Sequence, residues 1–562
     1  MNTRLLYPFI SCFFFILVFA SCNGNNKTVR DTIASTPEEL DQKTATLIER
    51  YLGKFTGGNS VVSDTDLQIS QPQLIKQLYR EREYSTIWSA KENWLPVADS
   101  MYHFIEQSRL FGLFPEEYYA GKLKKIREQF AADSLVSGDR KDAELWSKAD
   151  LMLTDAFVRI VKDIKLGRLP SDSITLRKDS VLSDAFFQQK LDAAFQSGIT
   201  TVFQSLEPDQ REYHLLKAGI RYFLASADYR QFTKVPYPEK DQNKFHRALQ
   251  KRLFEEGFIA FDSVAADSAR LADAVKLFQK KKGITVDGRA GEGTVRMMNV
   301  SDEEKFVRIA ISLDKYKMLP ERMPSKYIWV NASANFLEVV ENEEVKLSSK
   351  VICGKPKTRT PVLTSLISTL ITYPQWVPPP SIVMKEILPA VKKNPGYLAR
   401  KGFSLVDKEG NEVDPYSVDW SKYEKNIPYR VVQGSGDANA LGIMKFVFDN
   451  KYSVYLHDTN QRYLFANTMR SLSHGCVRVQ EWEKLAFYIL RNDSLSAGAG
   501  YTKIDSVKTW LRNKQKRSIP LRNKIPVYIR YITCEGKNGG IIFHDDIYGE
   551  DKMLREKYFS AR

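Results

Sequence analysis

The chain has 562 residues, too many for a single hydrophobic core, so three or more domains are expected. Hydrophobic residues make up 43% of it and charged residues 27%, which is ordinary for a globular protein. The formal net charge is +15, but the basic residues are scattered among acidic ones without a DNA-binding motif. We therefore expect no nucleic-acid partner, and the charge is compatible with an anionic surface such as a cell wall or a membrane.

The first 36 residues have the pattern of an export signal followed by a tether. Arg4 precedes an apolar stretch over residues 9–20, which is shorter than a membrane span of about 20 residues and fits a signal peptide. The Ala-Ser-Cys sequence that ends at Cys22 resembles a bacterial lipobox, which implies cleavage before this residue and acylation of its thiol. We expect a lipoprotein signal peptide over residues 1–21 and a flexible tether over residues 22–36. Ordinary secretion and an uncleaved anchor are the alternatives.

Cysteine usage argues against a disulfide framework despite this export signal. The chain has five cysteines, of which two lie in the leader: Cys12, Cys22, Cys353, Cys476 and Cys534. A bridge between Cys353 and Cys534 is one possibility, and two buried strand cysteines are the interpretation we prefer.

Residues 37–235 are predicted to form a mainly helical domain. The clearest helix is expected over residues 142–166, where apolar residues fall on one face at a spacing of three to four. Gly167 and Pro170 follow it in the order typical of a helix end. Further helices are expected over residues 38–52, 95–108, 183–195 and 210–224. No cluster of residues in this half suggests chemistry.

Residues 240–300 are predicted to form a small module of three helices. Phe245, Leu249 and Leu253 repeat along one helical face, and residues 271–278 carry a second apolar face. Glycines follow these faces, among them Gly257, Gly283, Gly288 and Gly291.

The remaining chain changes to short strands, which indicates a compact, mostly β domain over residues 325–512. A helix over residues 301–317 is expected to lead into it, and a helix over residues 481–490 to lie near its end. Strands are expected over residues 327–331, 336–340 and 345–351, and in the stretch that ends at Trp376. Residues 381–430 interrupt the strands with helical pieces, and we expect this insertion to cover a site as a lid. Residues 513–562 are predicted to add a C-terminal strand and a closing segment.

Two stretches of the β domain combine residue types that suggest nucleophilic catalysis. In residues 472–479, Cys476 follows Gly475 in a turn of small residues, and in residues 455–459, His457 lies at the end of an alternating run. A free thiol has a pKa of about 8.5 and needs a base or a positive field to become a thiolate.

His457 can remove the thiol proton, and Arg478 supplies a fixed cation for a substrate carboxylate. Gly475 allows a tight turn, so that backbone N–H groups could face an oxyanion. The sequence alone does not decide between His457 and His474 as the base. His474 lies so close before the thiol that its side chain would more naturally line the turn.

Two other interpretations of these residues were weighed. The first is a buried, unreactive Cys476 beside a packed histidine. The second is a zinc site made of His457, Asp458, His474 and Cys476, which lacks the second closely spaced ligand pair of such sites. Farther along, His544, Asp545 and Asp546 are metal-ligating residue types, for which we expect a structural role.

These residues resemble the L,D-transpeptidase family, whose motif is a histidine, a gap of under twenty residues and then Ser/Thr-His-Gly-Cys. The match here is His457 with Ser473-His474-Gly475-Cys476-Val477-Arg478. Arg478 is similar to the residue of the large periplasmic branch, and the resemblance extends from about residue 75 to the C-terminus. It implies that Cys476 is the acyl-enzyme nucleophile and that His457 accepts and donates the proton.

The resemblance also covers the other domains. Residues 84–88 with Trp94 resemble the scaffold domain of the large branch, and residues 274–294 look like a peptidoglycan-binding module. A spacer that binds nothing is the alternative for this module. The insertion resembles a capping subdomain. A substrate groove beside it is implied for five residues: Asn439, Tyr455, Ser473, His474 and Arg478.

The expected protein is therefore a multidomain α+β murein L,D-transpeptidase. The resemblance implies a thioester at Cys476 on a tetrapeptide stem, resolved by an amine of a second stem into a 3-3 cross-link, without metal or cofactor. Its implied partners are peptidoglycan stem peptides, carbapenem-type β-lactams as covalent inhibitors, and a membrane reached through lipid at Cys22, in the periplasm. The alternatives are an L,D-carboxypeptidase or endopeptidase that uses the same thioester, and a non-catalytic peptidoglycan-binding lipoprotein.

Overall fold

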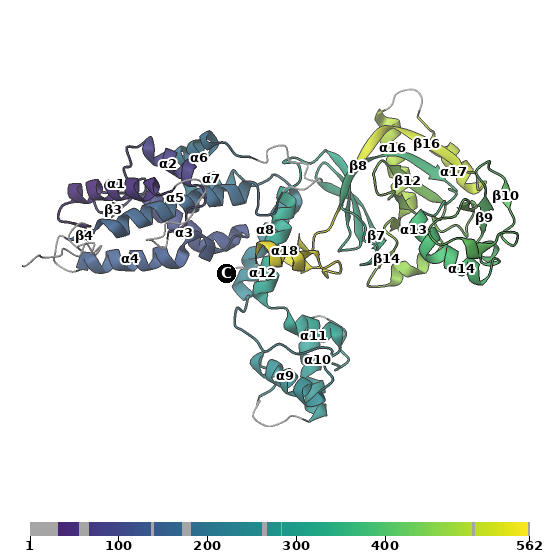
Figure 1. Cartoon of the computed structure of the whole chain (residues 1–562), viewed down its shortest axis with the longest axis horizontal. Helices are drawn as coiled ribbons and strands as arrows, with labels where there is room; N and C mark the ends of the chain where they lie inside the picture. Colours follow the sequence, from purple (N-terminus) through teal and green to yellow (C-terminus); the bar gives the residue numbers. More distant parts are fainter. Residues whose placement is uncertain are drawn as a thin grey trace, which may run out of the picture. The chain divides into compact units, whose positions relative to one another are not determined.

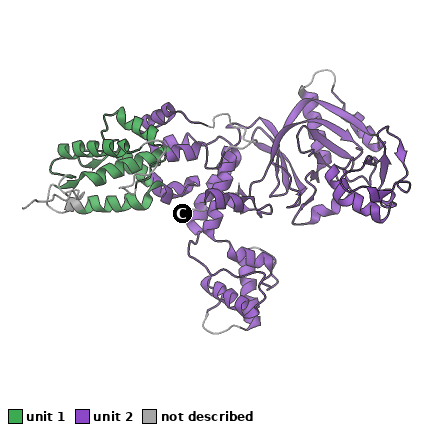
Figure 2. Ribbon diagram, viewed as in Figure 1, with its two compact units in different colours: residues 1–103, 118–158 green, residues 104–117, 159–562 purple. Residues whose placement is uncertain are grey.

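The structure is a computed structural model that describes residues 32–55, 67–135, 140–170, 181–260, 267–282, 284–496 and 501–559. The expected signal peptide, Cys22, most of the tether and Gly283 lie outside the described residues. The chain divides into two compact units, residues 1–103 with 118–158 and residues 104–117 with 159–562 (Figure 2). Helices dominate the N-terminal half and strands the C-terminal half, so the architecture is multidomain α+β as expected (Figure 1).

The first half of the chain is helical, and the helix expected over residues 142–166 is present as α5. Its helices are α1 (Pro37–Gly53), α2 (Pro72–Arg80), α3 (Pro96–Gln107), α4 (Ala120–Leu135) and α5 (Ala143–Lys165). Four short strands accompany them: β1 (Ile33–Ala34), β2 (Ser89–Ala90), β3 (Asn93–Trp94) and β4 (Lys141–Asp142). The sequence pattern did not indicate α2 and α4.

One buried carboxylate organises the core of the first unit. Asp150 of α5 accepts hydrogen bonds from the backbone N–H groups of Ile87 and Trp88, each at 2.9 Å, and from the Tyr79 hydroxyl at 2.6 Å. Burial raises the pKa of Asp150 to about 6, against the lowering effect of these donors. The Trp88 indole also donates to the Thr154 hydroxyl at 2.8 Å, so the aromatic stretch noted in the sequence lies in this core.

The second unit contains the remaining helices of the scaffold half and the small module. The scaffold helices are α6 (Asp184–Ser197), α7 (Ile199–Gln204) and α8 (Arg211–Ser226), and the expected connecting helix is α12 (Asp302–Lys317). The module consists of α9 (Gln242–Glu255), α10 (Ser268–Lys281) and α11 (Glu292–Asn299), as expected for a three-helix unit. Its core includes Leu249, Leu253, Leu271 and Phe278, the residues of the two apolar faces.

The catalytic half is built on one sheet that closes on itself in the described part of the chain. Its strand order is β14-β7-β15-β13-β12-β8-β16-β5-β6, and β6 also pairs with β7. The strands are β5 (Lys326–Asn331), β6 (Phe336–Glu341), β7 (Glu344–Gly354), β8 (Leu363–Thr372), β12 (Met444–Phe448), β13 (Leu456–His457), β14 (Ser471–Ser473), β15 (Val477–Val479) and β16 (Arg517–Arg530). The inward residues form the core with α16 (Trp482–Ser496) and α17 (Ile504–Arg512).

Two features of this sheet are its β6–β7 hairpin, which was expected at residues 341–344, and the place of its last strand. The β6–β7 hairpin has no glycine, and Asn342 and Glu343 adopt positive φ angles of 52° and 64° to make the turn. The C-terminal strand expected within residues 513–562 is β16, which begins at Arg517 and lies between β8 and β5. The C-terminal strand is therefore an internal part of the catalytic sheet.

The insertion over residues 381–430 has its own core and contains more than helices. Its helical parts are α13 (Pro380–Ile382), the π-helical turn η3 (Val383–Ile387), α14 (Leu388–Lys393) and α15 (Tyr397–Arg400). A small sheet of order β10-β9-β11 accompanies them, with β9 (Phe403–Val406), β10 (Glu412–Val413) and β11 (Arg430–Gln433). Leu405, Val431 and Trp420 pack with the helical residues Leu388 and Val391. The helical pieces expected in this insertion are present, and paired strands complete its core.

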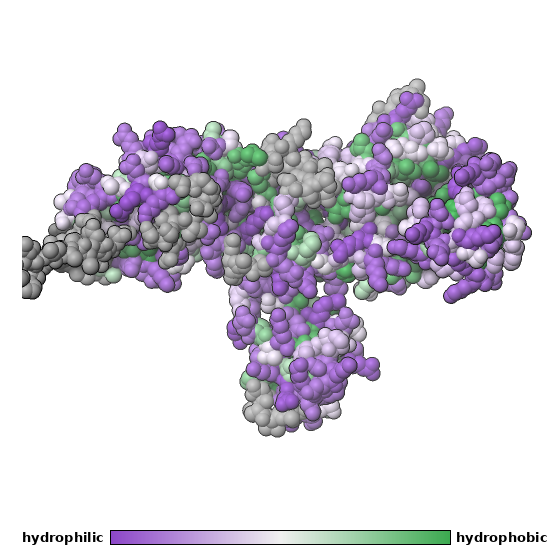
Figure 3. Space-filling model, in the orientation of Figure 1, coloured by the Kyte–Doolittle hydropathy of each residue, from purple (hydrophilic) through white to green (hydrophobic). Residues whose placement is uncertain are grey.

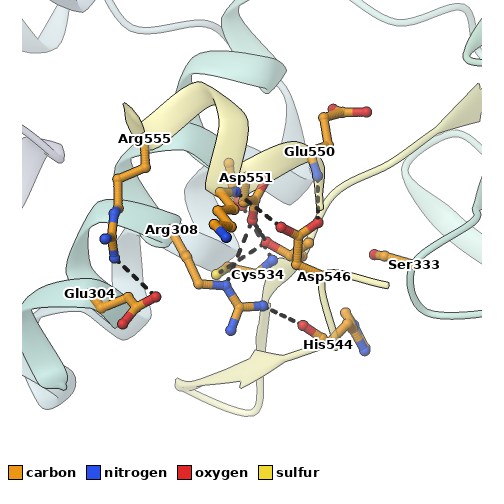
Figure 4. A network of polar contacts seen from close by, with 12 residues as sticks. Glu304, Arg308, Ser333, Cys534, His544, Asp546, Glu550, Asp551 and Arg555 are labelled. Atoms are coloured by element: carbon orange, nitrogen blue, oxygen red, sulfur yellow. Dashed lines mark hydrogen bonds and ion pairs between the residues drawn. The ribbon is translucent and has the colours of Figure 1, made fainter. Parts of the chain in front are cut away.

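The closing segment is held by buried ion pairs (Figure 4). It contains β17 (Cys534–Lys537), β18 (Gly540–Phe543) and α18 (Glu550–Tyr558). Asp551 of α18 is 2% exposed, and its carboxylate lies 3.0 Å from Lys315 Nζ and 3.6 Å from Arg308 Nε of α12. His544 contacts Glu535 at 2.7 Å, and its backbone carbonyl accepts from Arg308. These contacts give the His544 segment a structural role.

The described surface is polar over most of the face in view, with small hydrophobic areas between (Figure 3). Among the described helices, none has both the length and the apolar composition needed to cross a membrane.

The turn between β7 and β8 provides a test of the fold. Gly354 ends β7, and a Cβ atom there would lie 2.0 Å from the Thr358 carbonyl oxygen and 2.7 Å from the Thr360 amide nitrogen. Since both neighbours are backbone atoms, Gly354→Ala is expected to lower the free energy of unfolding by about 2 kcal/mol or more. The measurement is the thermal midpoint of the intact protein by circular dichroism.

Gly434→Ala is the matched control, because nothing lies within 4 Å of an added Cβ there. It should unfold like the wild type. An unchanged midpoint for Gly354→Ala would contradict the close approach of the 355–361 loop to β7.

Candidate active site

The pairing of β13 with β15 brings the candidate residues to one face of the sheet. The two strands are parallel, with Leu456 opposite Val477 and His457 opposite Arg478. Leu456 and Val477 are fully buried and belong to the core. Because side chains alternate along a strand, Tyr455, His457, Cys476 and Arg478 point to the other face.

That face opens into a cleft of about 230 Å³. Six of the residues expected at the site line it: Tyr455, His457, Ser473, His474, Cys476 and Arg478. The 381–430 insertion contributes Ser381, Ile382, Lys385 and Glu386 to the same lining. The insertion therefore borders the cleft.

The turn before Cys476 is held by its own side chains. The Ser473 hydroxyl donates to the Cys476 carbonyl at 2.6 Å and accepts from the Gly475 N–H at 3.1 Å. Gly475 has φ of 123°, a conformation that favours glycine. The Gly475 N–H thus has an intramolecular acceptor, whereas the Cys476 N–H has none among the described residues.

The loop after β7 supports the turn from outside. Thr360 donates through its hydroxyl to the Gly475 carbonyl at 2.8 Å, and the same hydroxyl accepts from the Gly354 N–H at 2.8 Å. The Thr358 hydroxyl and the Lys355 N–H both donate to the Ser473 carbonyl at 3.0 Å. These bonds fix the direction in which the Cys476 thiol leaves the turn.

His457 is buried, with 4% of its surface exposed, and its orientation is set by the next residue. Its Nδ1 lies in hydrogen-bond contact with the Asp458 carbonyl, which can only accept, so Nδ1 carries the proton of the neutral ring. Nε2 is then the nitrogen able to take a proton. Burial, with the positive charges of Arg478 and Lys445, lowers the pKa of His457 to about 3, while the Asp458 and Leu441 carbonyls act in the opposite direction.

Asp458 anchors this histidine, a role that the sequence did not indicate for it. Its carboxylate is fully buried and accepts from Arg462 Nε at 3.1 Å, Arg462 Nη2 at 2.7 Å and the Ile443 N–H at 3.1 Å. Gly442 approaches so closely that a Cβ atom would lie 2.2 Å from an Asp458 carboxylate oxygen. The signal available in the sequence was the Asp directly after the motif histidine.

The Cys476 thiol is half-buried and uncharged in its resting state. Burial raises its pKa, and hydrogen bonds from Tyr455 together with the charges of Lys445 and Arg478 lower it in part. His457 and Cys476 are therefore both uncharged at neutral pH, and both line the same cleft.

Lys445 is a second residue that sequence analysis missed. It lies on β12 directly opposite His457, and its Nζ is 3.8 Å from the centroid of the Tyr455 ring. Burial lowers the pKa of this ammonium group, and the Cys476 charge acts in the opposite direction. Arg478 lies on the neighbouring strand, where Nη1 donates to the Gln461 side chain at 2.9 Å. Two cations thus lie on the face that carries the thiol.

His474 and Asn439 were both expected to face the substrate groove, and each makes contacts that the sequence did not indicate. The His474 side chain points to the insertion, with Nε2 at 2.5 Å from Glu386 Oε1. Asn439 is 1% exposed, and its amide bonds to the Gly434 carbonyl at 2.7 Å and the Leu441 N–H at 2.8 Å. Asn439 therefore holds the loop whose Ala440 and Leu441 line the cleft, and is not itself in the lining.

The remaining described cysteines are structural. Cys353 and Cys534 are buried free thiols, as preferred over a disulfide bridge. Burial raises the pKa of each to about 12.

Family models match three parts of the chain. The model of the L,D-transpeptidase catalytic domain matches residues 325–496, the scaffold domain residues 73–219, and the "Putative peptidoglycan binding domain" residues 243–298. A protein of Haemophilus influenzae named "Putative L,D-transpeptidase" is 35% identical over 247 residues, which are 44% of this chain and 48% of that protein. The chain thus spans about half the length of this curated relative.

Two solved structures are similar in part. A crystal structure of an L,D-transpeptidase from Stackebrandtia nassauensis has a TM-score of 0.15 and 14% identity, and covers 54% of this chain and 96% of that one. A mutant L,D-transpeptidase of Enterococcus faecium has a TM-score of 0.16 and 12% identity, and covers 39% of this chain and 62% of that one. These scores are too low to carry an argument. Residues 325–496 therefore match the L,D-transpeptidase catalytic domain, and the segments before them match scaffold and peptidoglycan-binding domains.

Proposed function

We propose that this protein is a cell-envelope murein L,D-transpeptidase that forms 3-3 cross-links through an acyl-enzyme at Cys476. The observation that carries the proposal is the β13–β15 register, which turns Cys476, His457 and Arg478 into one cleft. A neutral imidazole whose Nδ1 is bonded to the Asp458 carbonyl is suited to accept a thiol proton at Nε2, and the thiol is suited to attack a peptide carbonyl.

In the acylation step, Cys476 Sγ attacks the carbonyl of the bond between the L-centre of the third stem residue and D-alanine. The thiol proton passes to His457 Nε2 and then to the amine of D-alanine, which leaves as the C–N bond breaks. Because the thiol pKa is raised and the imidazole pKa is lowered, the proton moves as attack proceeds and no stable ion pair precedes it.

Negative charge develops on the carbonyl oxygen in this step, and hydrogen-bond donors and cations of the site can stabilise it. The Cys476 N–H is a candidate oxyanion donor, and one such donor contributes about 3–4 kcal/mol in other acyl-transfer enzymes. The Gly475 N–H would contribute only after leaving Ser473 Oγ. The positive charges of Lys445 and Arg478 stabilise negative charge on the Cys476 sulfur.

In the second step an amine of another stem attacks the thioester and restores the thiol. Water in place of the amine would give carboxypeptidase or endopeptidase activity from the same intermediate.

The module over residues 243–298 is proposed to hold the protein on peptidoglycan, and lipid at Cys22 is proposed to hold it at a membrane of the periplasm. Carbapenem-type β-lactams are proposed to acylate Cys476.

The nucleophile is tested with Cys476→Ala. Release of D-alanine from tetrapeptide stems should fall at least about a thousandfold, since no other described thiol lines the cleft. The same variant should lose the mass increment of a bound carbapenem in intact-mass spectrometry. Cys353→Ala is the control for a cysteine outside the cleft and should retain acylation. D-alanine release at the wild-type rate by Cys476→Ala would rule out this nucleophile.

The neutral pair is tested by the pH dependence of alkylation at Cys476 with iodoacetamide. A thiol with a raised pKa is protonated at pH 7, so the rate should rise about tenfold per pH unit through pH 9. His457 stays neutral down to about pH 3, so it should add no step between pH 5 and 7. The site is read by peptide mass mapping.

A thiolate–imidazolium pair would behave differently, with a rate already high and constant between pH 5 and 8. Such a plateau would contradict the neutral pair. The buried Cys353 and Cys534 provide internal controls, because their pKa values of about 12 keep them unreactive over this range.

A further inference from the structure

The cleft carries one carboxylate among its described lining residues, and this carboxylate comes from the insertion. It is Glu386, in the π-helical turn Val383–Ile387, and its side chain is 51% exposed. The cations of the same lining are Lys385 beside it and Arg478 on β15. The insertion side of the cleft therefore carries the carboxylate of Glu386 beside the ammonium group of Lys385, and the sheet side carries the guanidinium of Arg478.

Glu386 is tied to the catalytic turn. Its Oε1 lies 2.5 Å from His474 Nε2, and His474 precedes Gly475 and the nucleophile directly in the sequence. A contact with a half-exposed histidine leaves the second carboxylate oxygen available to a ligand in the cleft. Trp376 and Tyr452 line the same space and supply aromatic faces, which also attract cations.

The two substrates of the proposed reaction present groups of opposite charge to the cleft: the donor stem presents carboxylates and the acceptor stem an ammonium group. The donor is held through carboxylates, for which Arg478 is suited. The acceptor brings a primary amine, which is an ammonium ion at neutral pH before it gives up a proton. An ammonium ion favours a carboxylate, and Glu386 is the one that the described cleft offers.

We propose that Glu386, held by His474, is the acceptor subsite that binds the primary ammonium group of the second stem. This inference rests on the proposed function. Once bound, the ammonium releases a proton to solvent, and its nitrogen attacks the thioester carbonyl. The C–N bond forms, the C–S bond breaks, and the second proton of the amine passes through His457 Nε2 to Cys476 Sγ. The products are the amide and the free thiol.

The consequence is that the insertion biases the acyl-enzyme toward amines and away from water. A partly exposed ion pair is worth up to about fivefold in an equilibrium constant, and it weakens with salt. The bias should therefore be a charge effect that a neutral nucleophile does not share.

The test uses the mature full-length protein with a tetrapeptide donor and two competing acceptors at pH 7. Glycinamide is mostly an ammonium ion at this pH, and hydroxylamine is mostly uncharged. Mass spectrometry gives the ratio of glycinamide adduct to hydroxamate, and D-alanine release gives the acylation rate. Glu386→Gln keeps an amide oxygen for His474 but removes the charge, so the ratio is expected to fall about fivefold. In the wild type alone, added salt should lower the ratio.

Glu424→Gln is the matched control, since Glu424 is an exposed carboxylate of the same insertion outside the cleft lining. It should leave the ratio unchanged. An unchanged ratio of glycinamide adduct to hydroxamate in Glu386→Gln would overturn the subsite. An equal loss of D-alanine release, hydroxamate and glycinamide adduct would also overturn it, because Glu386 would then act only by holding the insertion in place. Absence of D-alanine release by the wild type would instead overturn the proposed function.

Discussion

The site depends on the pairing of two very short strands. β13 and β15 are parallel, and their register is fixed because Leu456 and Val477 are both fully buried in the core. A slip by one residue would turn these two side chains to the cleft and bury the thiol and the imidazole, since the side-chain period of a strand is two. The same hydrophobic contacts that stabilise the sheet therefore direct the Cys476 thiol toward the cleft.

The Cys476 thiol beside this strand pair is uncharged in the resting state, although two cations lie on the same face. Burial acts on both reactive groups, raising the pKa of Cys476 and lowering that of His457. Lys445 and Arg478 add positive charge on the same face, and the Asp458 carbonyl selects the ring nitrogen that is free. Such a site keeps its sulfur weakly reactive until a carbonyl is bound, which protects a half-buried thiol from oxidation.

The sequence predicted the elements that depend on local pattern. The face of α5, the three helices of the module and the motif around Cys476 were all readable, since periodicity and residue type carry those signals. What it missed depends on pairing at long range. Lys445 is an ordinary strand lysine until β12 is placed beside β13, and Glu386 has no role until the insertion reaches His474. The β9–β11 sheet of the insertion also depends on packing and not on local propensity.

The position of β16 has a consequence for how the chain reaches its native state. This strand is among the last elements of the chain, yet it lies inside the sheet between β8 and β5. A nascent polypeptide that has emerged only as far as Cys476 still exposes two unpaired strand edges and an incomplete core. Folding of this half must therefore wait until β16 has been synthesised, and a chain cut short before Arg517 would lack the strand between β8 and β5 although Cys476 and His457 were both present.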